Sequence, residues 1–254
     1  GSIIANAVNA EIYENWTDVS GFLIADPRIV ENPEAIETIT YRELRELAYM
    51  GASVLHEDAI FPVRSAGIPI NIRNTNRPQD AGTMIVSNDY DFSRESLGHT
   101  ITGIAGKKGF STINIEKAMM NNELGFGMKV LNVLYQNGIS FEHMPSGIDT
   151  MSITVDSAKL EPVREKVLAE IRREVNPDHL EIEDGIAILA VVGRRMKNTR
   201  GTVARVFAAM AHARINVKLI DQGSSELNVI IGVSENDLPE AIRRIYDMFI
   251  SSEN

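Results

Sequence analysis

The 254-residue chain contains no cysteine, which excludes disulfides, thiolate catalysis and cysteine-ligated zinc. A chain without thiols suits a reducing compartment, and we expect it in the cytoplasm. No run of about 18 uncharged apolar residues occurs, so no membrane contact is expected. Basic residues are the minority, 25 against 35 acidic ones, and the net charge is −10. Nucleic acid is therefore not an expected partner, because phosphate binding needs clustered Lys and Arg.

Several short motifs of ligand sites are also missing. The sequence has neither the G-x-x-x-x-G-K-S/T phosphate loop nor the G-x-G-x-x-G dinucleotide motif. Its five histidines, at positions 56, 99, 143, 179 and 212, show no spacing typical of metal ligands, so we expect no metal site. The first residues, Gly1 to Ala5, are apolar and lack the basic region of a signal peptide. What remains is a chain with 44% apolar residues, enough for a packed core.

An internal repeat dominates the second half of the chain. The two copies are offset by 76 residues, the distance from Met120 to Met196. The same offset aligns further pairs, namely Asn122 with Asn198, Gly125 with Gly201, Val130 with Val206, Ile139 with Ile215 and Gly147 with Gly223. This period is too long for a solenoid unit. It indicates two small α+β modules of the ferredoxin-like βαββαβ type.

Each copy has a strand-like run, a glycine loop, an amphipathic helix, two more strands and a second helix. The first copy has its second helix near 158–174 and a candidate fourth strand at 179–183. The second copy has its second helix near 238–250 and ends without such a strand. The spare apolar run 100–105, ahead of the first copy, is the natural donor. We therefore predict that the two modules are interleaved.

Residues 1–86 alternate strand-like and helix-like runs, which predicts a mostly parallel α/β sheet. Thr40 and Glu43 have capping-box spacing, so a helix should begin there. Ligands of such sheets bind in loops at the carboxyl ends of strands. From composition alone, an ordinary turn is the favoured interpretation of the loop Asp26–Arg28. The polar residues 87–98 form a linker, and the two repeat copies occupy 99–184 and 185–254.

Three runs of the chain resemble aspartate kinases: Thr17 to Arg28 (TDVSGFLIADPR), Gly51 to His56 (GASVLH) and the end of the doubled module at 221–226 (DQGSSE). The similarity covers nearly the whole chain. It implies that 1–86 is the carboxyl-terminal part of a nucleotide-binding kinase domain with a partial amino-acid kinase fold. It also implies that 99–184 and 185–254 are tandem ACT regulatory domains.

The resemblance implies ATP-dependent phosphorylation of the aspartate β-carboxylate, the first step to lysine, threonine and methionine, with ATP and Mg²⁺ as cofactors of the intact enzyme. The implied nucleotide-binding residues are Thr17, Asp18, Leu23, Asp26, Arg28, Ser53 and Val54. Two positions depart from the family. Ser53 stands where many members have Lys and cannot supply a positive charge, and Leu23 stands where a tyrosine is common.

Two family motifs, Lys-Phe-Gly-Gly and Gly-Gly-Ser-Asp, do not occur in these 254 residues. They belong to the first half of such kinases, with the catalytic lysine and the aspartate-binding residues. We therefore expect the catalytic residues to lie in a preceding part of the protein. The chain on its own should be inactive and should require no cofactor.

In the family, ACT domains bind amino acids at interfaces between modules, and the resemblance implies an effector site in the first copy. Its residues are Met120, Glu123, Phe126, Gly127, Ser140, Phe141 and Glu142. The N–H groups and dipole at the start of a helix favour an α-carboxylate. Glu142 carries the charge that takes a lysine ammonium in lysine-inhibited relatives. From the residues alone, a solvated strand residue is the favoured interpretation of Glu142.

The second copy has Lys218 where the first has Glu142, so a cationic effector such as lysine should prefer the first copy. Asn216 and Gln222 are candidates for a polar neutral effector such as threonine. The resemblance also implies a homodimer, or a higher oligomer, formed through the ACT domains.

Two other functions stay open. The chain could be a non-catalytic amino-acid-binding ACT regulatory module or subunit, or belong to a kinase for another acidic substrate. The nucleotide loop at 17–28 favours a kinase over a pure regulator, and the tandem ACT tail disfavours the other acidic substrate.

Overall fold

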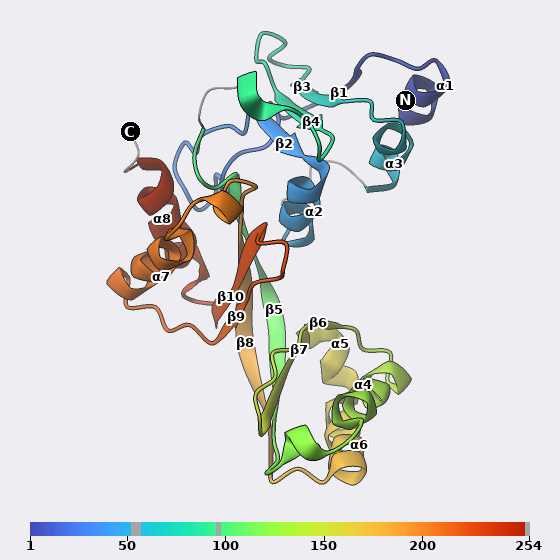
Figure 1. The fold of residues 1–254 in the computed structure, drawn as a ribbon, viewed down its shortest axis with the longest axis vertical. Coiled ribbons are helices and arrows are strands. Elements are labelled where there is room, and N and C mark those ends of the chain that lie inside the picture. The colour runs from blue at the N-terminus through green and yellow to red at the C-terminus, as the bar shows by residue number, and fades with distance from the viewer. Residues whose placement is uncertain (52–56, 95–97, 252–254) are drawn as a thin grey trace.

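The computed structural model describes residues 1–51, 57–94 and 98–251. The molecule is elongated, and both ends of the chain lie at one end of it (Figure 1). That end holds the first 86 residues, and the two long strands β5 (Gly103–Glu116) and β8 (His179–Val192) run side by side through the rest. The repeat modules are thus stacked along one axis below the amino-terminal segment.

The amino-terminal segment contains a four-stranded sheet in the order β1-β3-β4-β2. The strands are β1 (Tyr13–Thr17), β2 (Thr38–Thr40), β3 (Ile70–Asn74) and β4 (Thr83–Val86). The β1–β3 and β2–β4 pairs are parallel, and β3–β4 is antiparallel. The predicted mostly parallel sheet is therefore confirmed. Helices α1 (Ser2–Ala7), α2 (Tyr41–Tyr49) and α3 (Glu57–Ser65) accompany it, and a 3₁₀ turn, η1 (Phe92–Arg94), follows it.

The repeat modules share one antiparallel sheet in the order β6-β7-β5-β8-β10-β9. The added strands are β6 (Phe141–His143), β7 (Thr150–Asp156), β9 (Leu219–Asp221) and β10 (Asn228–Ser234). Residues 103–107 of β5 pair with 188–192 of β8, and residues 110–116 pair with 179–186. The second module thus takes its fourth strand from in front of the first, and the predicted interleaving is confirmed.

Because β5 and β8 each pass through both modules, β8 crosses the expected boundary between residues 184 and 185. The domain boundaries themselves stay predictions. The ladder between β5 and β8 shifts register between Lys107 and Phe110, where β5 leaves the second module and enters the first.

Helices α4 (Phe126–Gln136), α5 (Ser157–Leu160) and α6 (Arg164–Val175) cover the first module, and α7 (Thr202–His212) and α8 (Leu238–Tyr246) cover the second. The two groups lie on opposite sides of the β5–β8 ribbon (Figure 1). The helix expected near 158–174 is divided, because Pro162 lies in the 3₁₀ turn η3 (Glu161–Val163) that separates α5 from α6. Short irregular turns complete the elements: η2 (Met120–Asn122), η4 (Met196–Asn198) and the π-turn η5 (Asp247–Ser251).

The buried apolar residues form two cores. One is continuous from the amino-terminal segment into the second module and includes Leu47 of α2, Ile104 of β5 and Ile242 of α8. The other lies within the first module and includes Ile113, Val130 and Ile171. The second module is therefore packed as one body with the amino-terminal segment, while the first module has its own interior.

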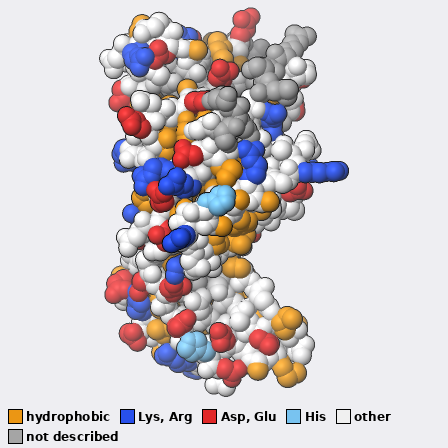
Figure 2. Space-filling view, turned by 90° about the vertical axis from the view of Figure 1, so that its left-hand side faces the viewer, with side chains coloured by type: hydrophobic (Ala, Val, Ile, Leu, Met, Phe, Trp, Pro, Cys, Tyr) orange, Lys and Arg blue, Asp and Glu red, His pale blue; other side chains and the backbone are white. Residues whose placement is uncertain are grey.

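Acidic and basic side chains are interspersed over the face that Figure 2 shows, so the net negative charge is not gathered in one block there. In the described ranges, the structure contains no helix that is both long and apolar enough to span a bilayer.

One buried carboxylate, that of Glu43, connects three parts of the chain. It completes the predicted capping box at the start of α2, where Thr40 N–H donates to Glu43 Oε2 over 3.0 Å. Its Oε1 accepts hydrogen bonds from the hydroxyl of Thr102, 2.6 Å away, and from the backbone N–H of Arg194, 2.8 Å away. The Arg194 guanidinium lies 3.3 Å from Oε2. Glu43 thereby joins α2, the approach to β5 and the loop after β8.

Burial alone would raise the pKa of Glu43. The Thr102 hydrogen bond, the charge of Arg194 and the backbone donors outweigh burial, so the pKa lies below its usual range. A carboxylate with a lowered pKa in the folded state stabilises the fold above its unfolded pKa. That contribution is lost as the pH falls through the folded pKa.

We therefore expect Glu43→Gln to lower the free energy of unfolding at pH 7 by about 2 kcal/mol, less than for a fully buried pair because Arg194 is partly exposed. Urea unfolding at several pH values measures this. The stability of Glu43→Gln should fall less steeply in acid than that of the unaltered chain, and exposed Glu31→Gln should behave as the unaltered chain. Equal acid dependence in both glutamine variants would contradict the assignment.

Candidate functional site

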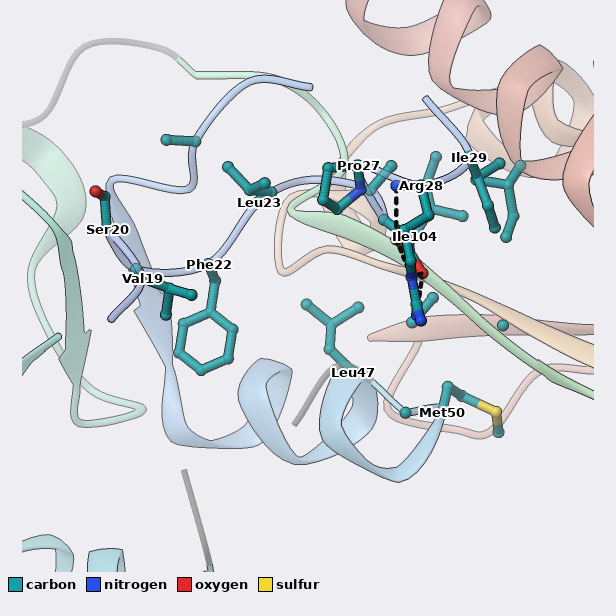
Figure 3. A pocket seen from close by; sticks show the side chains of 18 of the residues that line it. Val19, Ser20, Phe22, Leu23, Pro27, Arg28, Ile29, Leu47, Met50 and Ile104 are labelled. Atoms are coloured by element: carbon teal, nitrogen blue, oxygen red, sulfur yellow. Dashed lines mark hydrogen bonds and ion pairs between the residues drawn. The ribbon is translucent and has the colours of Figure 1, made fainter. Parts of the chain in front are cut away.

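A cavity of about 830 Å³ lies between the amino-terminal segment and the second module. The loop 19–29, which follows β1, forms one wall, and the end of α2 contributes Leu47 and Met50 (Figure 3). Residues 104–108 of β5 and Ile242 of α8 form the opposite wall. The cavity therefore lies beyond the carboxyl end of a parallel strand, where α/β sheets bind ligands.

The start of the loop is fixed to β4 by one hydroxyl. Thr83 Oγ1 accepts a hydrogen bond from Phe22 N–H, 2.8 Å away, and donates to the Ile36 carbonyl, 2.6 Å away. Gly21 adopts φ +98°, and a Cβ at this position would overlap the Thr83 side chain. Ser20 donates to Asp80 over 2.6 Å. These contacts set the path of the loop along the cavity.

Three of the predicted nucleotide-binding residues border the cavity: Leu23, Asp26 and Arg28. The guanidinium of Arg28 pairs with the Asp26 carboxylate through two nitrogens, at 3.0 Å (Nε–Oδ1) and 2.6 Å (Nη2–Oδ2). The Arg28 hydrogen bonds hold the pKa of Asp26 below its usual value. Arg28 is itself largely exposed. Its charge is therefore already matched by a carboxylate, which limits what it alone can offer to a phosphate.

The other predicted nucleotide residues lie elsewhere. Thr17 ends β1, and its hydroxyl donates to Asp18 over 3.1 Å. Neither residue is part of the cavity wall. Ser53 and Val54 lie outside the described residues.

Sequence reasoning did not find the wall that β5 and α8 contribute. Lys107, Lys108 and Ile242 belong to the second module, at least 78 residues beyond Ile29 where the loop ends. No local motif connects such distant segments. The one available signal is the doublet Lys107–Lys108 followed by Gly109, in a run that has no other charged residue from Gly103 to Ile115.

The effector residues predicted ahead of α4 are mostly engaged within the first module. Met120 and Phe126 are buried, and Gly127 lies in the first turn of α4. Glu123 forms ion pairs with Lys117 and with Lys129, the latter at 2.6 Å. The hydrogen bond from Lys117, followed by that from Lys129, lowers the pKa of Glu123.

The remaining first-module residues surround β6. Ser140 and Phe141 are exposed, whereas Glu142 is half-buried and accepts a hydrogen bond from the hydroxyl of Tyr49 at the end of α2. Burial raises the pKa of Glu142. Glu142 therefore lies where the first module meets the amino-terminal segment.

Within one chain, the predicted effector residues ahead of α4 lie far from those around β6. Phe141 pairs with Val155, which pairs with Ser111 of β5, whereas Met120 follows Glu116 at the other end of that half-strand. Along β5, Ser111 and Glu116 are five residues apart, which at roughly 3.4 Å per residue is a separation of about 17 Å. A small amino acid cannot contact both groups in a single chain.

In the second module, Asn216 and Gln222 are both exposed and flank the edge strand β9. In the same strand, Asp221 lies 3.0 Å from His143 Nδ1 of β6, so the edge strands of the two modules meet. Among the described residues, no group of three or more His, Asp or Glu side chains could hold a metal ion.

Comparison with known proteins identifies both parts. Residues 1–74 match the amino acid kinase family, and residues 189–249 match the ACT domain. The chain is 40% identical to Aspartokinase 3 of Bacillus subtilis over 99% of its own length and 54% of that protein. The crystal structure of Clostridium acetobutylicum aspartate kinase superposes with a TM-score of 0.92 at 54% identity, covering 98% of this chain and 57% of that one.

A structure of E. coli aspartokinase III in complex with lysine and aspartate has the same fold. The superposition has a TM-score of 0.74 at 22% identity and covers 98% of this chain and 54% of the E. coli chain. The fold and matches define the class as an amino acid kinase segment joined to ACT regulatory modules. Within this class, the chain is similar to aspartate kinases over nearly its whole length. It spans about half the length of the Bacillus relative.

The hydroxyl of Thr83 gives a direct test of the loop geometry. Thr83→Val keeps the side-chain shape but leaves Phe22 N–H and the Ile36 carbonyl without this partner, which should lower the free energy of unfolding by about 1–3 kcal/mol. Thermal unfolding followed by circular dichroism measures the change. Thr150→Val, on the exposed end of β7, is the control. Equal stability of the two variants would show that the loop is held by other contacts.

Proposed function

We propose that this chain is the regulatory and partial nucleotide-binding region of an aspartate kinase, which transfers the γ-phosphoryl group of ATP to the β-carboxylate of aspartate in the cytoplasm. The reaction forms an acyl phosphate and releases ADP. One observation carries the proposal: the cavity beside the Asp26–Arg28 loop is closed by the regulatory sheet itself. Ligand binding at the kinase loop and the position of the regulatory modules therefore involve the same residues.

The chemistry of the cavity fits a nucleotide. Its apolar side, with Phe22, Leu23 and Leu47, suits a flat ring, and its charged side suits phosphate groups. The nucleotide would supply the phosphoryl group, with Mg²⁺ as its companion ion. The chain's own part is to bind and orient it, with Asp26 holding the Arg28 guanidinium at the cavity wall.

The effector of the proposed enzyme is an amino acid, lysine in first place, bound at Glu142. A half-buried carboxylate attracts an ammonium group more strongly than an exposed one does. E. coli aspartokinase III has been crystallised with lysine, which agrees with this choice of ligand class. The separation of Glu142 from the α4 loop favours a homodimer. In this dimer, β6 of one copy lies beside the second copy. The two halves of the effector site then come from different chains.

Glu142→Gln should therefore raise the Kd of lysine at least tenfold, measured by titration calorimetry on the 254-residue chain. Because the pKa of Glu142 is raised, lysine binding to the unaltered chain should weaken as the pH falls through that pKa. Glu31→Gln, which removes an exposed carboxylate of the amino-terminal segment, is the matched control. Unchanged lysine affinity in Glu142→Gln would overturn the assignment.

The alternative function is a regulatory subunit that binds amino acids and takes no part in nucleotide binding. The Asp26–Arg28 loop speaks against it, because a pure regulator needs no nucleotide loop.

Assayed alone, the chain should release no ADP in an aspartate-dependent reaction, since it lacks the Lys-Phe-Gly-Gly and Gly-Gly-Ser-Asp motifs. It should nevertheless bind ADP in calorimetry. Lysine binding without ADP binding would support the regulatory subunit. Aspartate-dependent ADP release by the purified chain would contradict the expected inactivity.

A further inference from the structure

The wall of the cavity that faces the Asp26–Arg28 loop belongs to the regulatory sheet. Lys107 and Lys108 of β5 lie in this wall, at the point where β5 passes from the second module to the first. We propose that these two lysines bind the phosphate groups of the nucleotide held at the kinase loop. The proposal rests on the proposed nucleotide site and adds to it two residues of the regulatory part of the chain.

The arginines of the cavity cannot supply the charge that phosphates need. Arg28 pairs with Asp26 through two nitrogens, and Arg77 Nε lies 3.2 Å from Asp80 Oδ2. Each of these pairs has no net charge. A nucleoside diphosphate or triphosphate carries several negative charges, and its binding is strongest where cations are not already neutralised.

The two lysines differ from the arginines in this respect. Both are exposed, and within the described ranges neither has a carboxylate at ion-pair distance. The Lys107 ammonium lies 5.3 Å from the centre of the Phe110 ring. In a chain whose net charge is −10, the cavity thus has two unneutralised positive charges on one wall.

The backbone explains why two successive lysines can reach the same cavity. In a regular strand, neighbouring side chains point to opposite faces of the sheet. Here the β5–β8 ladder shifts register between Lys107 and Phe110, and Gly109 adopts φ +93°. Glu235 Oε1 accepts a hydrogen bond from Gly109 N–H over 2.7 Å, which holds the irregular turn. Bulges of this kind redirect side chains and occur often beside functional sites.

The rest of the cavity defines the ligand class. Figure 3 shows the side chains of Phe22, Leu23, Leu47, Met50 and Ile104 around the same space. The volume of about 830 Å³ lies within the usual range of small-molecule sites. An apolar pocket with cations on one wall fits a molecule with an uncharged ring and a polyphosphate, which is a nucleoside diphosphate or triphosphate.

The test compares K107Q/K108Q with the unaltered 254-residue chain by titration calorimetry with ADP, adenosine and tripolyphosphate. The Kd of ADP should rise at least tenfold in the double variant, and the slope of log Kd against log salt concentration should become shallower. Adenosine, which lacks phosphates, should bind both proteins equally. The control is K159Q/K166Q, which removes two exposed lysines of the first module's helices. If the double variant does not fold, the single variants K107Q and K108Q replace it.

Arg28→Ala, measured in parallel, separates this proposal from the nucleotide site on which it rests. If Arg28→Ala weakens ADP binding and K107Q/K108Q binds ADP within twofold of the unaltered chain, the role of the lysines is overturned and the loop site stands. If the lysine variant alone loses ADP and tripolyphosphate affinity, the lysine site is supported and the loop is not its nucleotide anchor. No ADP binding by the unaltered chain would overturn both.

Discussion

The buried carboxylate of Glu43 determines how the parts of this chain are held together. It caps α2 of the kinase-like segment and at the same time accepts hydrogen bonds from Thr102 and Arg194, which belong to the approach to β5 and to the loop after β8. A buried carboxylate without these partners would be unfavourable, so all three segments must be in place together. The position of α2, and with it the Leu47 side of the cavity, therefore depends on the regulatory sheet.

The two buried apolar cores do not follow the division of the chain into two repeat copies. By sequence, the two modules are equivalent copies, but only the second shares its apolar interior with the kinase-like segment. Backbone contacts strengthen this union, since Ile104 N–H donates to the Ile24 carbonyl over 2.7 Å. The first module reaches the segment by the Tyr49–Glu142 hydrogen bond instead. The second module is thus packed firmly against the amino-terminal segment. The first module is a separate unit that contacts this segment through a polar hydrogen bond.

The sequence predicted the features that depend on local or repeated patterns. The capping box at Thr40 and the offset of 76 residues gave the start of α2 and the interleaved modules. Pro162 is a sequence signal for the break between α5 and α6, and the prediction of a single helix near 158–174 did not take it into account. The partners of Glu43 could not be predicted, because Arg194 is 151 residues away and no local alternation or spacing indicates such a contact. For the same reason, the cavity wall with Lys107 and Lys108 could not be predicted. Likewise, the distance between Glu142 and the α4 loop depends on strand register, which the residue pattern leaves undetermined.

The path of the two long strands has an evolutionary meaning. Lys107 and Ile188 face each other across the β5–β8 ladder, and the chain leaves the second module at one and returns at the other. The first copy is therefore an insertion into the second, entered and left at a single point. An antiparallel pair cut at this point can be closed by a two-residue turn. The geometry makes the first module a unit that duplication could introduce, and recombination could replace, while the contacts of the second module with the amino-terminal segment remain intact.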